Sequence, residues 1–268
     1  MQNQTNSWQE QFKKDGYVFI KNFFTPEEIT NLMTEIKSAK TRSGVSGIDR
    51  EALTFYSSLF FYSRPLQSFV AQQRIIDLLT PIIGSDFWVR WDQAVAKEPG
   101  SGTFPWHQDN AYSHLKDGYY QLWIAMTEMS ADNGGLWLVP GSHKHLLPHQ
   151  RVGNHLKWEG TSENAVFIAA EPGDIVLFSS FLLHKTTPNV TKNPRWTYVI
   201  EYMSIDHFDP GVEPPYFIVG RNGRSQQEFV HFYRGRLNPM NHMKYLGFRW
   251  KSNLLNLGSK ISKIGLKF

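Results

Sequence analysis

The first part of the chain alternates between helical and extended patterns of hydrophobic residues. Residues 8–15 carry apolar side chains at helical spacing, and Gly16 separates them from the apolar run 17–20. This pattern predicts a short helix followed by a buried strand. Residues 65–83 show another helical pattern. We therefore expect a helical N-terminal cap over about residues 1–86.

A longer helix is predicted to begin at Thr25. The Thr25 hydroxyl can accept a hydrogen bond from the N–H of Glu28, and the Glu28 carboxylate can reach back to the N–H of Thr25. Pro26 suits the first helical position, because its missing N–H has no helical partner there. Apolar residues then recur on one helical face, at Ile29, Leu32, Met33 and Ile36.

Short runs rich in β-branched and aromatic residues follow from residue 87 onward. They are 87–91, 121–126, 135–139, 175–178 and 196–200. Turn sequences such as Asp132-Asn133-Gly134 and Pro140-Gly141-Ser142 separate them. The pattern predicts an all-β core with flanking helices, a sandwich or a barrel, and the double-stranded β-helix (jelly-roll) is one such fold.

The chain shows no internal repeat and no Gly/Ser/Pro-rich linker. We therefore expect a single domain over residues 1–268. Within it, the jelly-roll core would span about residues 87–205, and a C-terminal appendage about 206–268.

Composition narrows the class of protein. Of the 268 residues, 41% are hydrophobic and only 19% are charged, which excludes global disorder. The chain has no cysteine, which excludes a disulfide scaffold, an iron–sulfur protein and a thiol nucleophile. No apolar run is long enough for a membrane span, and no signal peptide is recognisable. We expect a cytoplasmic protein without a membrane span.

The C-terminal part of the chain is basic. Residues 229–268 contain eight Lys or Arg and no Asp or Glu. A basic tail can bind nucleic acid, but eight charges over forty residues are few, and a solvated face is the simpler interpretation. Within it, apolar residues at helical spacing predict an amphipathic helix over residues 252–268.

His107 and Asp109 form the first candidate metal-binding pair. On an extended segment, residues i and i+2 point to the same side, so the imidazole and the carboxylate can converge. His184 follows a buried strand and can supply a third ligand, although a structural core histidine would look the same. Two histidines and one carboxylate make the facial triad of non-haem Fe(II) oxygenases.

Arg195 follows His184 by eleven residues, across a turn rich in Pro and Asn. A guanidinium that points into a barrel needs an anionic partner, because an unpaired buried charge is very unfavourable. A dicarboxylate cosubstrate would supply that partner, and the hydroxyl of Thr186 lies on the same side as His184. A structural ion pair of Arg195 is the alternative.

These residues, in their order and spacing, resemble the phytanoyl-CoA dioxygenase-like family of Fe(II)/2-oxoglutarate-dependent oxygenases. Matching segments extend over about residues 10–205. They are Phe12-x-x-Asp15-Gly16-Tyr17-Val18, Trp106-His107-Gln108-Asp109-Asn110-x-Tyr112, Asn133-Gly134-Gly135-Leu136, Val139-Pro140-Gly141-Ser142-His143 and Pro172-Gly173-Asp174. The residues after this region contain no motif of the family.

The resemblance implies an enzyme with Fe(II) as its metal and with 2-oxoglutarate and O2 as cosubstrates. His107, Asp109 and His184 would be the catalytic iron ligands. The implied reaction couples the oxidative decarboxylation of 2-oxoglutarate, which yields succinate and CO2, to hydroxylation of an unactivated C–H bond. Related halogenases usually have a small residue in place of Asp109, so hydroxylation is favoured over halogenation. Desaturation, cyclisation and epimerisation stay open.

The resemblance also assigns residues to the cosubstrate. Arg195 and Thr186 would bind the distal carboxylate of 2-oxoglutarate. Gln93 and Trp123 occupy positions where the family places side chains against the cosubstrate, although a Trp on a strand is often plain core.

Candidate substrate-facing residues lie on the segments after the metal strand and after the last predicted strand. They are Asn110, Tyr112, His114, His207 and Phe208. The longer metal-strand signature of the ectoine hydroxylases is not matched, and no adenine or phosphate cradle for a CoA thioester is evident. We expect a small-molecule substrate, a specialised metabolite or its precursor.

Three other functions fit parts of the pattern. A jelly-roll protein could bind a metal or ligand without turnover, and a zinc hydrolase could use the same two histidines and aspartate. Neither has a use for Arg195 and Thr186. Nucleic-acid oxidation has only the basic tail in its favour, so no nucleic-acid partner is expected. The oligomeric state stays open.

Overall fold

The computed structural model describes residues 2–43, 48–50 and 53–231. The helices are α1 (Gln2–Asp15), α2 (Pro26–Ser43), α3 (Arg64–Val70), α4 (Gln73–Ile83) and α5 (Asn110–Ser113), with 3₁₀ turns η1 (Leu59–Tyr62) and η2 (Ser142–Lys144). No helix in these ranges is both long enough and apolar enough to cross a membrane. The amphipathic helix predicted at 252–268 lies outside the described residues.

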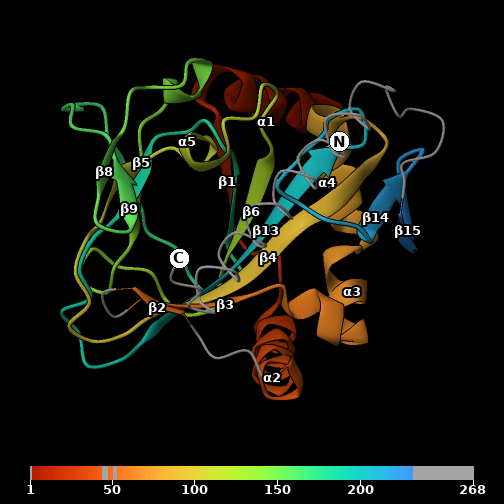
Figure 1. Ribbon diagram of the computed structural model, residues 1–268, viewed down its shortest axis with the longest axis horizontal. Helices are drawn as coiled ribbons and strands as arrows, with labels where there is room; N and C mark the ends of the chain where they lie inside the picture. Colours follow the sequence, from red (N-terminus) through yellow and green to blue (C-terminus); the bar gives the residue numbers. More distant parts are fainter. Residues whose placement is uncertain (1, 44–47, 51–52, 232–268) are drawn as a thin grey trace, which may run out of the picture.

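Two antiparallel sheets form the core (Figure 1). The main sheet runs in the order β1 (Tyr17–Ile20), β11 (Ile175–Ser179), β6 (Tyr120–Ala125), β13 (Arg195–Ser204), β4 (Phe87–Lys97), β14 (Tyr216–Arg221) and β15 (Arg224–Val230), with β3 (Leu53–Ser57) on β4 and β2 (Ile48–Arg50) on β3. The second sheet runs in the order β10 (Val166–Ile168), β7 (Leu136–Leu138), β12 (His184–Thr186) and β5 (Phe104–His107). A hairpin of β8 (Gln150–Val152) and β9 (His155–Lys157) lies beside β5.

The main sheet is buried on both faces, and alternate residues of its strands divide between two hydrophobic clusters. On β6, Ile124 packs with residues of α2 and α4 on the helical side. Its neighbour Trp123 packs with Leu136 and Leu138 of β7, between the sheets. The helices therefore close one face of the main sheet, and the smaller sheet covers the other (Figure 1).

The predicted start of α2 is confirmed. The N–H of Glu28 donates to the Thr25 hydroxyl at 3.2 Å, and the N–H of Thr25 donates to the Glu28 carboxylate at 2.8 Å. Glu28 also pairs with Arg74 of α4. The reciprocal cap fixes the first turn of α2, and the ion pair joins it to α4.

The single helix predicted over residues 65–83 is wrong in one respect, because the structure divides it into α3 and α4. The chain is extended at Gln72, with φ −59° and ψ 137°. Tertiary contacts satisfy carbonyls that the helix would otherwise have used. The Tyr202 hydroxyl donates to the Val70 carbonyl at 2.8 Å, and the Ser225 hydroxyl donates to the Ala71 carbonyl at 2.5 Å.

The main sheet continues past residue 205, the end expected for the jelly-roll core. Strand β14 pairs antiparallel with the first residues of β4, and β15 pairs with β14. Phe217 of β14 stacks on Phe60 of η1 at a ring-centroid distance of 5.5 Å. The hairpin thus belongs to the same sheet as β4 and β13, which carry Gln93 and Arg195.

Candidate metal centre and cosubstrate pocket

The two sheets bring His107, Asp109 and His184 together. His107 ends β5 and His184 begins β12, and the two residues are direct partners across these strands. Asp109 follows β5 at the start of α5 and presents one oxygen to each imidazole, at 3.2 Å from His107 Nε2 and 3.3 Å from His184 Nε2. One ligand atom from each residue lies within 4.8 Å of the others, a cluster able to hold a metal ion.

Backbone carbonyls orient both imidazoles. Nδ1 of His107 lies 2.8 Å from the Pro105 oxygen, and Nδ1 of His184 lies 2.9 Å from the Leu182 oxygen. Because a carbonyl oxygen only accepts, each Nδ1 carries the proton and donates. The lone pair of each Nε2 is then left for a metal, as such hydrogen bonds commonly arrange around metal-binding histidines.

Electrostatics keep His184 and Asp109 in their ligand forms. Burial and the nearby His107 lower the pKa of His184 to about 4, so His184 is neutral near pH 7. Burial alone would raise the pKa of Asp109, but His184 and His107 outweigh it and hold that pKa below its usual range. A neutral imidazole and an ionised carboxylate are the forms of His184 and Asp109 that bind a divalent cation.

Gln121 of β6 holds the aspartate in place. Its amide donates to Asp109 Oδ2, the oxygen that also faces His184. Gln108, between the two ligands in sequence, is buried and accepts from the Leu147 N–H at 2.7 Å, while its amide donates to the His145 carbonyl at 2.8 Å. The metal-binding segment is therefore supported from both sides.

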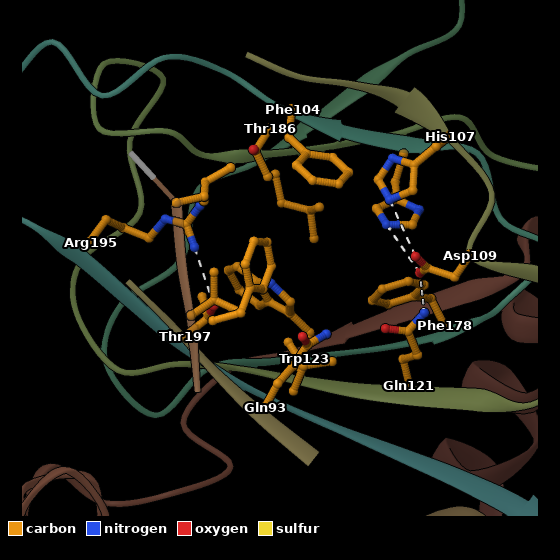
Figure 2. A pocket seen from close by; sticks show the side chains of 16 residues that line it. Gln93, Phe104, His107, Asp109, Gln121, Trp123, Phe178, Thr186, Arg195 and Thr197 are labelled. Carbon is orange, nitrogen blue, oxygen red and sulfur yellow. Dashed lines mark hydrogen bonds and ion pairs between the residues drawn. The ribbon is translucent and has the colours of Figure 1, made fainter. Parts of the chain in front are cut away.

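The triad lies at one end of a cavity of about 120 Å³ between the sheets. Figure 2 shows His107 and Asp109 at that end and Arg195 at the opposite end. Trp123 lines the space between them, and Phe178 lies at the triad end, with its ring 5.1 Å from that of His184. An elongated ligand in this cavity would reach from the His107, Asp109 and His184 triad to the Arg195 guanidinium.

Arg195 is buried, with 2% of its surface exposed. Its guanidinium donates to the Gly134 carbonyl at 2.8 Å and to the Thr197 hydroxyl at 3.2 Å. The Nε–H is buried and has no partner among the residues that the structure describes. Burial lowers the pKa of Arg195 to about 10, which leaves it charged at neutral pH. No carboxylate in the described ranges pairs with it, so the structural ion pair weighed as an alternative is not found there.

Thr186 lies across the same end of the cavity (Figure 2). The Lys97 ammonium donates to its hydroxyl oxygen at 3.2 Å and to the Gly102 carbonyl at 2.7 Å. Lys97 is fully buried, and burial and the nearby Arg195 lower its pKa to about 7. Because Thr186 accepts from Lys97, its own O–H is left to donate.

Gln93 and Trp123 lie on the two strands that flank β13 in the main sheet. Val199 of β13 pairs with Gln93 on one side and with Trp123 on the other, so the three side chains share the inward face. All three line the cavity between the triad and Arg195. Both residues therefore lie beside the space predicted for the cosubstrate.

A second cavity, of about 280 Å³, adjoins the first. The two share Phe55, Gln93, Phe104 and Asp109, so they meet beside the Asp109 carboxylate. Tyr112, predicted to face the substrate, lines this second cavity.

The other predicted substrate residues lie elsewhere. Asn110 is buried and uses its amide in two hydrogen bonds to the Leu115 backbone, at 2.8 and 3.1 Å, which shape the turn after α5. His207, Phe208 and His114 line a separate cavity of about 510 Å³ that does not include the triad. A substrate contact by these residues therefore stays a prediction.

Several residues of the site were not predicted from the sequence. They are Lys97, Phe104, Gln121, Phe178 and Thr197 of the first cavity and its border, and Arg90, Tyr119 and Glu201 of the second. Strand alternation could have found Thr197 and Glu201, which share one face of β13 with Arg195, and Gln121, which lies two residues from Trp123 on β6. The others depend on strand pairings that no local pattern reveals.

A family model described as phytanoyl-CoA dioxygenase matches residues 12–197. Among curated proteins, the chain is 27% identical over 240 residues to the ectoine dioxygenase of Stutzerimonas stutzeri (strain A1501), which covers 77% of this chain and 78% of that protein. It is 25% identical over 229 residues to the methylphosphonate hydroxylase of Gimesia maris, covering 76% of this chain and 83% of that protein.

Solved structures share the fold. The epimerase SnoN, solved with Fe3+, α-ketoglutarate and nogalamycin RO, aligns with a TM-score of 0.67 at 18% identity over 78% of this chain and 87% of its own. EvdO2 from Micromonospora carbonacea var. aurantiaca, solved with 2-oxoglutarate, aligns with a TM-score of 0.62 at 23% identity over 73% and 89%. The predicted jelly-roll fold is confirmed.

Proposed function

The chain belongs to the phytanoyl-CoA dioxygenase family, and we propose that this 2-oxoglutarate-dependent dioxygenase hydroxylates an unactivated C–H bond of a small molecule. Fe(II) is its metal, and 2-oxoglutarate and O2 are its cosubstrates. The resemblance found in the sequence is confirmed by the family match, which spans the predicted ligands His107, Asp109 and His184.

The observation that carries the proposal is the pairing of the metal cluster with Arg195 inside one cavity. Arg195 is a fully desolvated cation without a carboxylate partner among the described residues, and its Nε–H is unsatisfied. Such a group is strongly unfavourable unless a ligand supplies an anion. A dicarboxylate satisfies both parts of the cavity, because one carboxylate pairs with Arg195 while the other end of the molecule binds the metal.

The donor set fits Fe(II). We assign His107, Asp109 and His184 as the metal ligands, which leaves the remaining coordination positions to cosubstrate and oxygen. When bound, the metal would supply the oxidative chemistry that converts 2-oxoglutarate to succinate and CO2 and oxidises the substrate C–H bond. The protein itself orients the groups and shields the site from water.

The predicted cosubstrate residues of the first cavity, and Gln121, then each have a role. Arg195 and Thr186 bind the distal carboxylate of 2-oxoglutarate, one with its charge and the other with its hydroxyl. Gln93 and Trp123 flank the body of the cosubstrate. Gln121 keeps Asp109 from rotating away from the imidazoles.

The space beside the triad supports a small substrate. The second cavity, of about 280 Å³, lies at the lower end of the size range of small-molecule sites, and a nucleic-acid strand would need an open groove instead. The relatives named above act on ectoine and methylphosphonate, which are small molecules as well. We propose a specialised metabolite or its precursor as the substrate, and the cytoplasm as the place of reaction.

Hydroxylation is the simplest outcome for a site with an intact carboxylate ligand. Asp109 occupies the position that halogenases leave open for chloride, and it is held there by Gln121. Desaturation, cyclisation and epimerisation use the same triad and differ only in where the substrate is held. The choice among them depends on the residues of the second cavity.

The experiment is a substrate-library screen of the full-length protein with Fe(II), 2-oxoglutarate and O2, read out as succinate formed and as substrate mass. A hydroxylated product, heavier by one oxygen atom, with one succinate per product, is the expected result. The Asp109→Ala variant serves as the control, and it should form no succinate with any member of the library.

The alternative function is a jelly-roll protein that binds a metal or ligand without turnover. It predicts that 2-oxoglutarate is never consumed and that Arg195→Ala leaves metal-dependent ligand binding unchanged. Absence of the visible charge-transfer absorption of an anaerobic Fe(II)/2-oxoglutarate complex would favour this alternative. Its appearance in the wild type and loss in His184→Ala would favour the oxygenase.

A further inference from the structure

We propose that the second cavity binds an organic ammonium ion and that the Glu201 carboxylate is its counter-ion. This inference rests on the proposed function, because it takes the cavity beside the metal cluster as the substrate site.

The inner face of β13 has opposite charges at its two ends. Arg195, Thr197, Val199 and Glu201 alternate along the strand and share one face. The first three line the cavity of the cosubstrate, and Glu201 lines the second cavity. One strand therefore presents a cation to the proposed cosubstrate and a carboxylate to the proposed substrate.

A β-bulge places Arg90 beside Glu201. Trp91 pairs with Glu201 and Val89 pairs with Tyr202, so Arg90 is an extra residue of β4 without a register partner on β13. Bulges turn a side chain away from the regular alternation. Here the bulge brings the Arg90 guanidinium to the cavity wall, where it pairs with Glu201.

Each nitrogen of the guanidinium has an acceptor. Its Nη1 pairs with Glu201, its Nε donates to Asp209 at 2.5 Å, and its Nη2 donates to the Ser113 hydroxyl at 3.1 Å. The three charged side chains are at most 9% exposed. Arg90 is thus neutralised by two carboxylates, which makes it a poor partner for a bound anion.

One guanidinium and two carboxylates leave a net negative charge at this wall of the second cavity. Glu201 uses Oε2 for Arg90, and no donor among the described residues pairs with its Oε1. That oxygen is not among the fully enclosed polar atoms, and Glu201 lines the cavity. A carboxylate oxygen that faces a cavity and lacks a donor is suited to accept a charge-assisted hydrogen bond from an N⁺–H group.

The remaining walls favour the same class of ligand. Aromatic side chains line the cavity: Phe55, Trp91, Phe104, Tyr112 and Tyr119. The Tyr119 ring already packs against Arg90, whose guanidinium carbon lies 4.2 Å from the ring centroid, so the other four rings are those considered for a ligand. Aromatic faces attract cations, and this attraction is strengthened where water is excluded. An aromatic box with one carboxylate oxygen therefore selects an organic ammonium ion over a neutral or anionic molecule of equal size.

The test uses the full-length protein loaded anaerobically with Fe(II) and 2-oxoglutarate, and isothermal titration calorimetry. The measurement is made at pH 8, because burial raises the pKa of Glu201 to about 7 and the carboxylate is mostly ionised above that pH. Three probes share one ring and differ in charge: benzylamine, benzyl alcohol and benzoate. We expect benzylamine to bind at least ~10-fold more tightly than benzyl alcohol, as desolvated charge pairs allow, and benzoate to bind no better than the alcohol.

Glu201→Gln retains an acceptor for Arg90 but removes the charge. It should abolish the preference for benzylamine, while Glu201→Asp, with a retracted carboxylate, should retain part of it. Glu163→Gln, a change at an exposed carboxylate in a loop, should leave all three affinities unchanged. The Fe(II)/2-oxoglutarate absorption of each variant reports that the protein is folded and loaded.

Equal binding of the three probes, no binding of any, or preference for benzoate overturns the inference. A preference for benzylamine that survives Glu201→Gln overturns it too, because direct coordination of the amine to iron would then explain the preference. Failure of the proposed function is distinguishable. In that case the Fe(II)/2-oxoglutarate complex does not form even before a probe is added.

Discussion

Lys97 and Arg195 are direct partners across β4 and β13, so two cations lie side by side at the end of the cavity opposite the metal cluster. Neither has a carboxylate partner among the residues described. Lys97 donates to Thr186, which lines the cavity together with Arg195. Two basic side chains, rather than a single arginine, therefore lie at the end of the cavity opposite the triad.

Binding of 2-oxoglutarate should take up a proton at Lys97. The pKa of Lys97 is lowered to about 7 by burial and by Arg195, so above pH 7 the free protein holds Lys97 largely neutral. A bound dicarboxylate favours the charged form and raises that pKa. The affinity for 2-oxoglutarate should increase as pH falls from about 9 towards 7, with proton uptake measured by calorimetry in buffers of different ionisation enthalpy.

Lys97→Gln should remove the proton uptake and weaken 2-oxoglutarate binding by roughly tenfold, the value of one hydrogen bond to a charged group. Lys192→Gln, a change at an exposed lysine, is the matched control. Proton uptake that persists in Lys97→Gln would assign it to another group.

Arg195→Ala should raise the concentration of 2-oxoglutarate required for half-saturation by ~10²–10³, because loss of one partner of a buried charge pair costs roughly 3–5 kcal/mol. Fe(II) binding should survive, since Arg195 lies at the far end of the cavity from the triad (Figure 2). Titration of 2-oxoglutarate and of Fe(II) separates the two effects. Arg151→Ala on the exposed strand β8 should change neither.

Gln121→Met should weaken Fe(II) binding by about 10–100-fold, the usual effect of removing a group that orients a metal ligand. The reason is the hydrogen bond from the Gln121 amide to Asp109. Equilibrium titration with Fe(II) under anaerobic conditions measures the change, and Gln150→Met at an exposed position is the control. An unchanged affinity would show that Asp109 needs no support from β6.

Asp92→Asn should make the stability of the protein less dependent on pH. Burial raises the pKa of Asp92 from 3.8 to about 7, while the Tyr198 hydroxyl, 2.6 Å away, acts in the opposite direction. A carboxyl group with a raised pKa in the folded state contributes stability that is present below the unfolded pKa and lost as pH rises through about 7.

Relative to Asp92→Asn, the wild type should therefore lose up to about 4 kcal/mol of unfolding free energy between about pH 4 and pH 8. The side-chain carbonyl of the asparagine variant can still accept from the Tyr198 hydroxyl and from the Phe60 N–H, so the hydrogen bonds are retained. Urea unfolding of both proteins across this range gives the difference. A constant difference at all pH values would show that Asp92 is ionised in the folded protein.

The sequence alone determined the features that depend on short stretches of chain. The capping residues Thr25 and Glu28 and the alternation that divides β6 between two clusters follow from the geometry of a helix and of a strand. The spacing of His107 and Asp109 is also local, so the candidate ligand pair was evident before any fold was known. His184 and Arg195 were candidates from their own sequence context, and the family resemblance supported them through their order in the chain.

The tertiary structure decided what depends on strand register and on contacts between distant segments. It brought Lys97 beside Arg195, turned Arg90 towards Glu201 through a bulge, and divided residues 65–83 into two helices by supplying partners for their carbonyls. None of these has a local signal, because a shift of one residue in register moves every side chain to the opposite face of the sheet. The chemistry of the metal cluster was therefore visible in the sequence, while the charges that surround it became visible only when the sheets were paired.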